Sequence, residues 1–153
     1  MAHSNDGREM EWTESLGFHI RRAEQAIAAR KAEAFRTLGL TVPQAMALCL
    51  LLDDPGKSCT HLSRESGVTS QTMTGIIGNL ESKSLVTREA SPDHARVHLF
   101  TLTSDGSDLA AKARVLGMGI EEDLMSEVDP TVREKLLDAL NRLADLAPTA
   151  GAF

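Results

Sequence analysis

The chain has 153 residues, of which 42% are hydrophobic and 25% charged, with a formal net charge of −6. These values fit one folded domain with a helical appendage and exclude a disordered tail or a fibre. The longest strongly apolar run, residues 45–52, is too short to span a bilayer, and the N-terminus lacks the apolar core of a secretory signal; we therefore expect a soluble, cytoplasmic protein.

The negative charge is unevenly distributed along the chain. Residues 57–98 contain five basic and four acidic residues, whereas residues 99–153 contain five and ten. Because affinity for duplex nucleic acid comes largely from cations that neutralise phosphates, a polyanion would have to bind the middle of the chain. One Trp, four Phe and no Tyr argue against a single-strand binder, which needs exposed rings for base stacking.

Two helices are predicted in the first third. Apolar residues recur at spacings of four, three and four between Leu16 and Ile27, which indicates an amphipathic helix from Thr13 to about Thr37. Thr41 is a candidate N-cap, and Pro43 sits early enough for its missing N–H to cost nothing. The run QAMALCLLL is apolar on nearly every side, so this second helix belongs in the core and ends at residues 53–56.

The middle of the chain predicts two short helices and a hairpin. A helix from about Thr60 to Ser66 ends at Gly67, and Thr69 caps a longer helix with Met73 and Ile77 on its apolar side. Two β-rich runs, residues 85–90 and 96–103, flank a five-residue loop and read as a hairpin. Since a two-stranded hairpin is unstable alone, it must lean on the preceding helices.

The last third is helical again from Ser104, with a break at Asp129-Pro130 and a final helix that carries Val132, Leu136 and Leu140. The apolar stripes at both ends of the chain exceed the core available to cover them, so we expect them to pack against a second copy; the alternative is a monomeric bundle. The predicted division is an N-terminal tail and dimerisation helix (1–40), a central domain (41–103) and C-terminal dimerisation helices (104–153).

A helix, a Gly turn, a polar-faced helix and a hairpin together predict a winged helix-turn-helix, mainly α with a small β wing. In this fold the second helix lies in the major groove. Gln71 can bond adenine bidentately, and the methyl group of Thr74 can contact that of thymine. The alternative is a solvated polar face with good capping; the hairpin favours DNA binding.

The chain resembles the MarR family of bacterial transcription regulators. The resemblance is carried by LTVPQAMALCLLLDDPG, by CTHLSRESGVTSQTMTGIIGNLESKSLVTRE and by SPDHARVHLFTLTSDG, in that order and spacing. It implies a dimer of winged helix-turn-helix subunits joined by intertwined terminal helices. It also implies repression that a small phenolic or amphipathic ligand releases.

The resemblance assigns roles to two arginines. Arg96 matches the wing-tip Arg that enters the minor groove, and Arg88 matches a basic residue on the first wing strand. A narrow minor groove concentrates negative potential and attracts a guanidinium. The sequence departs from the family at Gly75 and Asn79, where Arg is common, at Ser84, where Gly is usual, and at the wing tip, where Ala replaces a cation before Arg96.

The predicted partner is a pseudo-palindromic DNA duplex with half-sites about 34 Å apart. The basic residues available for phosphates are Lys57, Arg64, Lys83, Arg88 and Arg96. If all five bound phosphates in each subunit, a dimer would make about ten contacts, and log affinity would fall against log salt with a slope near −9; we expect a shallower slope. The competing hypothesis is a winged-helix protein-interaction module without specific DNA binding. The candidate DNA-contacting residues are Lys57, Arg64, Thr69, Ser70, Gln71, Thr72, Thr74, Arg88 and Arg96.

Other chemistry is weakly supported. No nucleophile elbow, phosphate loop or paired metal-ligand spacing occurs, so we expect no catalytic residues, cofactor or metal. Cys49 reads as a core residue, whereas Cys59, at a helix start near Lys57, is a candidate for either a structural or a redox role. A ligand pocket would lie where the first, second and fifth helices meet; its candidate lining residues are His19, Arg22, Met46 and Cys49, and packing or surface roles are the alternative for each.

Overall fold

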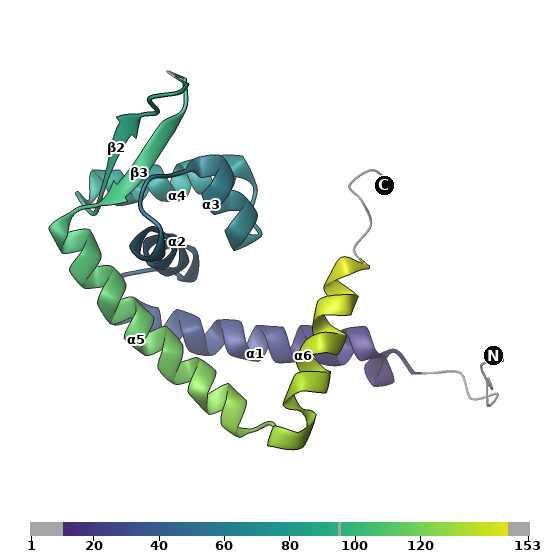
Figure 1. The fold of residues 1–153 in the computed structure, drawn as a ribbon. Coiled ribbons are helices and arrows are strands. Elements are labelled where there is room, and N and C mark those ends of the chain that lie inside the picture. The colour runs from purple at the N-terminus through teal and green to yellow at the C-terminus, as the bar shows by residue number, and fades with distance from the viewer. Residues whose placement is uncertain (1–10, 95, 147–153) are drawn as a thin grey trace. The chain divides into compact units, whose positions relative to one another are not determined.

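The computed structural model describes residues 11–94 and 96–146. It is mostly helical with one small sheet, which confirms the predicted fold class. The elements in chain order are η1 (Trp12–Glu14), α1 (Leu16–Arg36), α2 (Val42–Asp53), β1 (Lys57–Ser58), α3 (Cys59–Ser66), α4 (Ser70–Ser82), β2 (Val86–Ala90), β3 (His98–Leu102), α5 (Ser104–Ser126) and α6 (Pro130–Asp145) (Figure 1).

The chain divides after Gly117 into two compact units, and each is described by itself. The first contains η1 through the first part of α5, and the second contains the rest of α5 and α6. None of the helices in the described ranges combines the length and apolar composition needed to cross a membrane.

Local capping explains where the first helices begin. The Ser15 hydroxyl accepts a hydrogen bond from the Phe18 amide at 3.2 Å and starts α1. Thr41 and Gln44 form a reciprocal capping box at the start of α2, with the Gln44 side chain accepting from the Thr41 amide at 3.0 Å. The predicted N-cap at Thr41 is therefore confirmed, whereas the predicted start of the first helix at Thr13 falls in the short η1 turn.

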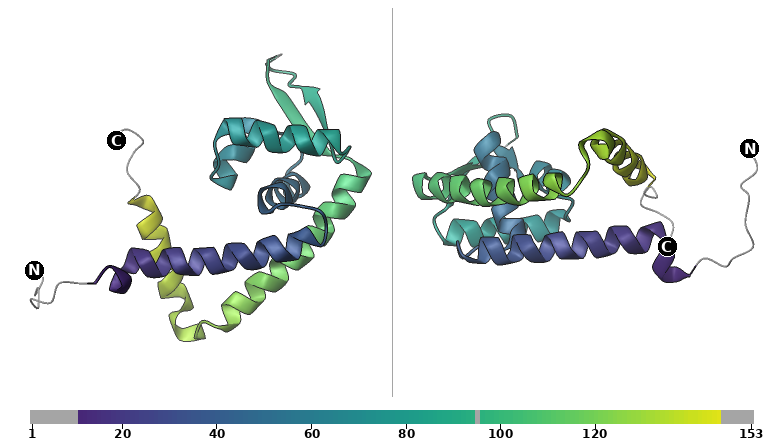
Figure 2. Two further views of the ribbon diagram at one scale, coloured as in Figure 1. Left: turned by 180° about the vertical axis from the view of Figure 1, so that it is seen from behind. Right: turned by 90° about the horizontal axis from the view of Figure 1, so that it is seen from below.

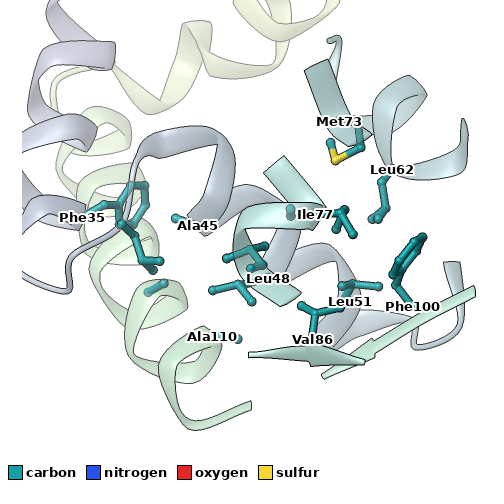
Figure 3. Close-up of a cluster of buried hydrophobic side chains, with 14 residues drawn as sticks. Phe35, Ala45, Leu48, Leu51, Leu62, Met73, Ile77, Val86, Phe100 and Ala110 are labelled. Atoms are coloured by element: carbon teal, nitrogen blue, oxygen red, sulfur yellow. The ribbon is translucent and has the colours of Figure 1, made fainter. Parts of the chain in front are cut away.

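The core of the first unit surrounds α2. Its residues Ala45, Ala47, Leu48 and Leu51 are buried, as expected for a helix that is apolar on nearly every side. Figure 3 shows side chains from the surrounding elements converging on this helix. The buried cluster also includes Phe35, Leu40, Leu62, Met73, Ile77, Leu80, Val86, Phe100, Ala110 and Ala113.

The sheet has three strands rather than the two predicted. Its order is β1-β3-β2, and both pairings are antiparallel. Within the hairpin, Arg88 on β2 pairs with Phe100 on β3. The third strand, β1, lies on the other side of β3 and pairs Lys57 with Phe100. The hairpin is thus supported by a strand that precedes α3, in addition to the helices.

The junction between the hairpin and α5 is tightly packed. The Thr103 hydroxyl donates to the Ser84 carbonyl at 2.9 Å and accepts from the Gly106 amide at 3.0 Å. Ser84 has a φ of +57°, a left-handed conformation that favours glycine. A Cβ at Gly106 would lie 2.9 Å from the Leu85 carbonyl carbon, so this position requires glycine. These contacts fix where the hairpin ends and α5 begins.

The second unit is dominated by α6. Asp129 caps the helix by accepting from the Thr131 amide and hydroxyl, and Pro130 follows at its first position, which confirms the predicted break. Arg133 Nε donates to the Val128 carbonyl at 3.0 Å. The stripe Val132, Leu136, Leu140 and Leu143 is 37–46% exposed, so this unit does not cover it.

Candidate nucleic-acid interface

The helix-turn-helix is built from two local signals that the sequence contains. Gly67 ends α3 with a φ of +66°, which lets the chain turn within three residues. The Thr69 hydroxyl then accepts from the Thr72 amide at 3.1 Å and starts α4. Both predicted boundaries are confirmed, and α3 begins one residue earlier than expected, at Cys59.

The two sides of α4 are sharply divided. Met73, Ile77 and Leu80 are buried against the core, so the opposite side of the helix faces outward. The predicted polar row lies on this outward side: Thr69, Ser70, Gln71, Thr72 and Thr74 are all exposed. In Figure 1, α3 and α4 lie side by side next to the hairpin formed by β2 and β3. This arrangement places a polar helix face beside a projecting wing.

We call the hairpin of β2, β3 and the connecting residues 91–97 the wing. The Ser91 amide donates to the Val97 carbonyl at 2.8 Å, and the Val97 amide donates to the His94 carbonyl, so a tight turn forms the wing's end. Arg96 is exposed in this turn, two residues before β3 begins. Figure 1 and the left view of Figure 2 show the hairpin projecting beyond the neighbouring helices.

The predicted cations differ in their surroundings. Arg64, Lys83 and Arg96 are exposed and form no ion pair with the described residues. Arg88 Nε instead lies 3.4 Å from Glu81 Oε1, which links the wing to α4. The sequence analysis did not predict this contact, because its partners lie seven positions apart on two different elements.

Lys57 occupies a more enclosed position than the other cations. Its ammonium is 2.6 Å from Glu65 and 3.7 Å from Asp54, and its side chain is only 12% exposed. An ammonium held by two carboxylates is a poor phosphate ligand, since the phosphate would have to displace them. The geometry therefore favours a structural role for Lys57 over its predicted DNA contact.

A cleft of about 300 Å³ separates α4 from the wing. It brings Thr74, Arg88 and Arg96 together, whereas Arg64, Ser70 and Gln71 lie outside it. The full lining is Ser58, Cys59, Thr60, Thr74, Ile77, Glu81, Arg88, Arg96, Val97, His98 and Phe100.

Burial disfavours the thiolate form of both cysteines. Burial raises the pKa of Cys59, against smaller effects that include a hydrogen bond with the Thr74 hydroxyl. Burial also raises the pKa of Cys49, whose sulfur lies 3.8 Å from the Ala110 carbonyl oxygen. Because the thiolate is the reactive species, these surroundings favour the structural interpretation of Cys59 over the redox one.

The four predicted ligand-lining residues lie on α1 and α2, and none of them lines either of the two clefts described for the first unit. His19 and Arg22 are exposed in the N-terminal half of α1, where the His19 ring meets Phe18 edge-on. Met46 is 40% exposed and Cys49 half-buried on α2. A nearly apolar cleft of about 460 Å³ lies elsewhere, between the end of α1 and α5, and is lined by Thr37, Leu38, Ala111, Lys112, Val115 and Leu116.

In residues 11–94 and 96–146, no group of three His, Cys, Asp or Glu side chains is arranged to hold a metal ion. The helix-turn-helix, the supporting strand and the wing together define a winged helix-turn-helix protein. The sequence profile described as the MarR family matches residues 38–97. Over these residues the chain is similar to the MarR family, and the relatives described next are named as transcription regulators.

Several relatives share most of the chain. The HTH-type transcriptional repressor Rv2887 of Mycobacterium tuberculosis is 28% identical over 128 residues, which cover 84% of this chain and 92% of the relative. Its solved structure in complex with salicylic acid has a TM-score of 0.64, is 28% identical and covers 84% of this chain and 96% of that one.

Two further solved structures bear on DNA binding. The transcriptional repressor CouR, bound to a 23-mer DNA duplex, has a TM-score of 0.77 at 28% identity and covers 90% of this chain and 98% of its own. BpsR of Bordetella bronchiseptica, whose DNA binding is described as regulated by 6-hydroxynicotinic acid, has a TM-score of 0.82 at 25% identity over 90% of this chain and 99% of its own.

Proposed function

We propose that this chain is a homodimeric, sequence-specific repressor that binds double-stranded DNA and is released by a small ligand. The observation that carries the proposal is the pairing of an exposed polar row, Thr69 to Thr74, with an exposed Arg96 at the end of the wing. The first suits a major groove and the second a neighbouring minor groove. The DNA-bound relative CouR, similar over 90% of this chain, supports this arrangement.

The dimer is proposed from apolar surface that each unit leaves exposed. On α1, Leu16 is 60% exposed and Ile20 37%, and on α6 Leu136 is 43% exposed. Exposed apolar stripes of this kind mark protein interfaces. In the proposed arrangement, residues 1–40 and 104–153 join two subunits and residues 41–103 read one half-site each, so the operator is pseudo-palindromic.

The effector is proposed as a small phenolic or otherwise amphipathic molecule. The relatives that support this class are Rv2887, solved with salicylic acid, and BpsR, regulated by 6-hydroxynicotinic acid. A ligand changes DNA affinity only if it binds the competent and incompetent arrangements of the two reading helices with different affinity. A repressor that acts in this way on bacterial DNA works in the cytoplasm, which is the location that the proposal implies.

The proposal is tested by gel retardation of the DNA upstream of the protein's own coding sequence, with a scrambled duplex as control, at several salt concentrations. If Arg64, Lys83 and Arg96 each neutralise one phosphate per subunit, a dimer makes about six contacts, and log affinity should fall against log salt with a slope near −5. Arg96→Ala should weaken binding, whereas Arg36→Ala, which removes an exposed cation of α1, should not.

Two outcomes would contradict the proposal. Salt-independent binding, or an Arg96→Ala variant that binds as well as the unchanged protein, would remove the wing from the interface. Absence of any specific shift at low salt would favour a winged-helix module that binds a protein partner. Sedimentation of the unchanged protein tests the dimer separately, and a monomer at micromolar concentration would overturn that part.

A further inference from the structure

The side chains along the exposed face of α4 are not equivalent, because most of their hydrogen-bonding groups are already used within the protein. Thr69 accepts from the Thr72 amide and shares a second bond with the Thr72 hydroxyl at 2.8 Å. These two hydroxyls therefore cap the helix and are directed at each other. A base edge would have to compete with the cap for them.

Ser70 and Thr74 have also committed their hydroxyl protons. The Ser63 hydroxyl donates to the Thr60 carbonyl at 3.0 Å, so the Ser70 hydroxyl, 3.3 Å from Ser63 Oγ, is the donor of that pair. The Thr74 hydroxyl donates to the Ser70 carbonyl at 2.8 Å. Each hydroxyl has a single proton, so these side chains offer DNA only lone pairs and methyl or methylene groups.

The next turns of α4 offer little more. Gly75 and Gly78 have no side chain, and a Cβ at either position would meet nothing within 4 Å. The Asn79 side-chain oxygen accepts from Gln44 Nε2 at 2.7 Å, which ties it to the capping residue of α2. The middle of this face is therefore bare backbone, followed by an amide whose oxygen is engaged by Gln44.

Gln71 differs from all of these neighbours. Its side chain is exposed and makes no hydrogen bond with the described residues, so its amide keeps two N–H donors and a carbonyl acceptor. It lies in the first turn of α4, the part of a recognition helix that reaches base edges. A glutamine amide in that position matches adenine, accepting from the N6 amino group and donating to N7.

We infer that Gln71 is the specificity-determining residue of α4 and selects an adenine at one position of each half-site. The inference rests on the proposed function, because it concerns the DNA that α4 reads. Guanine presents two acceptors, N7 and O6, in the major groove and needs two donors, whereas the Ser70 and Thr74 hydroxyls have committed their protons and the Thr69–Thr72 pair keeps only one. The helix therefore discriminates purines through one amide, and its neighbours contribute shape and thymine-methyl contacts.

Binding-site selection from a randomised duplex library, read out by sequencing, tests this inference for the full-length protein. The unchanged protein should enrich an A·T pair at one fixed position in each half-site. Gln71→Ala should lose the preference at that position alone, with roughly 5- to 150-fold weaker binding to the selected site, the range that one bidentate pair supplies, and unchanged binding to scrambled DNA. Gln71→Arg should shift the preference at the same position to G·C.

Gln25→Ala is the matched control, because it makes the same substitution at an exposed glutamine of α1, outside the winged helix-turn-helix; its selected sequence should be unchanged. Circular dichroism confirms that each variant is folded. A selected sequence that Gln71→Ala leaves unaltered, or one that Gln25→Ala alters at the same position, would overturn the inference while DNA binding stands. If the unchanged protein selects no sequence at all, the proposed function itself fails.

Discussion

The Glu81 carboxylate on α4 lies 3.4 Å from Arg88 Nε on β2, so the reading helix and the wing are joined by an ion pair at the surface proposed to meet DNA. Glu81 also adds a negative charge beside the arginine that the sequence assigns to a phosphate. The pair therefore restrains Arg88 and opposes DNA binding. Both side chains remain partly exposed, 57% for Arg88 and 28% for Glu81, so a phosphate can compete for the guanidinium.

Glu81→Gln should raise DNA affinity, because it removes this repulsion and releases Arg88 to contact a phosphate. The slope of log affinity against log salt should steepen by up to about 0.9 for each phosphate gained. The control is Glu89→Gln, which removes the same charge from the exposed wing strand at a residue without an ion pair among those described. Fluorescence anisotropy over a salt series measures both; equal slopes, or weaker binding of Glu81→Gln, would contradict the prediction.

Ser84→Gly should stabilise the protein by about 1 kcal/mol, because Ser84 adopts a φ of +57°, where glycine has no Cβ penalty. The same change two residues earlier provides the control. Ser82 lies in the last turn of α4 and donates to the Asn79 carbonyl at 2.7 Å, so Ser82→Gly should destabilise. Urea unfolding at one protein concentration measures both signs; a destabilised Ser84→Gly variant would show that the serine hydroxyl matters more than the backbone conformation.

Gly106→Ala should destabilise the protein by about 1–3 kcal/mol or more, since the added Cβ would overlap the Leu85 carbonyl group. To relieve this overlap, α5 must move away from Leu85, which also disturbs the Thr103 hydrogen bonds to Ser84 and Gly106. Gly17→Ala is the control, because a Cβ there meets nothing within 4 Å. The midpoint of thermal unfolding should fall for Gly106→Ala only, and similar midpoints for both variants would contradict the close approach.

The thiol of Cys59 should react slowly at neutral pH, because burial raises its pKa above the ordinary value of 9.0. A raised pKa means that the folded state favours the protonated thiol. The raised pKa of Cys59 therefore stabilises the folded state fully below pH 9.0, and this stabilisation is lost as the pH rises through the folded-state pKa. The pH dependence of the alkylation rate of a Cys49→Ser variant across pH 7–11, compared between the folded and the urea-unfolded protein, measures this shift. A midpoint that is lower for the folded protein than for the unfolded protein would contradict the prediction and support a redox role for Cys59.

Local signals made much of the reading module predictable. Gly67 and Thr69 determine where α3 ends and α4 begins, because a left-handed glycine and a capping hydroxyl act within a few residues of themselves. The buried positions Met73, Ile77 and Leu80 follow from helical periodicity in the same way. The outward polar row is then the complement of the buried face, so its location required no knowledge of distant parts of the chain.

Tertiary contacts decided which charged and amide side chains around this polar row are engaged by the protein itself. The strand β1 is only two residues long and carries no alternation, so it is recognisable only through its pairing with Leu99 and Phe100. The Gln44–Asn79 hydrogen bond and the Lys57–Glu65 ion pair likewise join residues on different elements. Sequence spacing specifies which residues share a helix face, because that depends on local geometry. It does not specify which donors and charges bind partners from other elements. Lys57 and Arg88 have such partners, whereas Gln71 and Arg96 have none among the described residues.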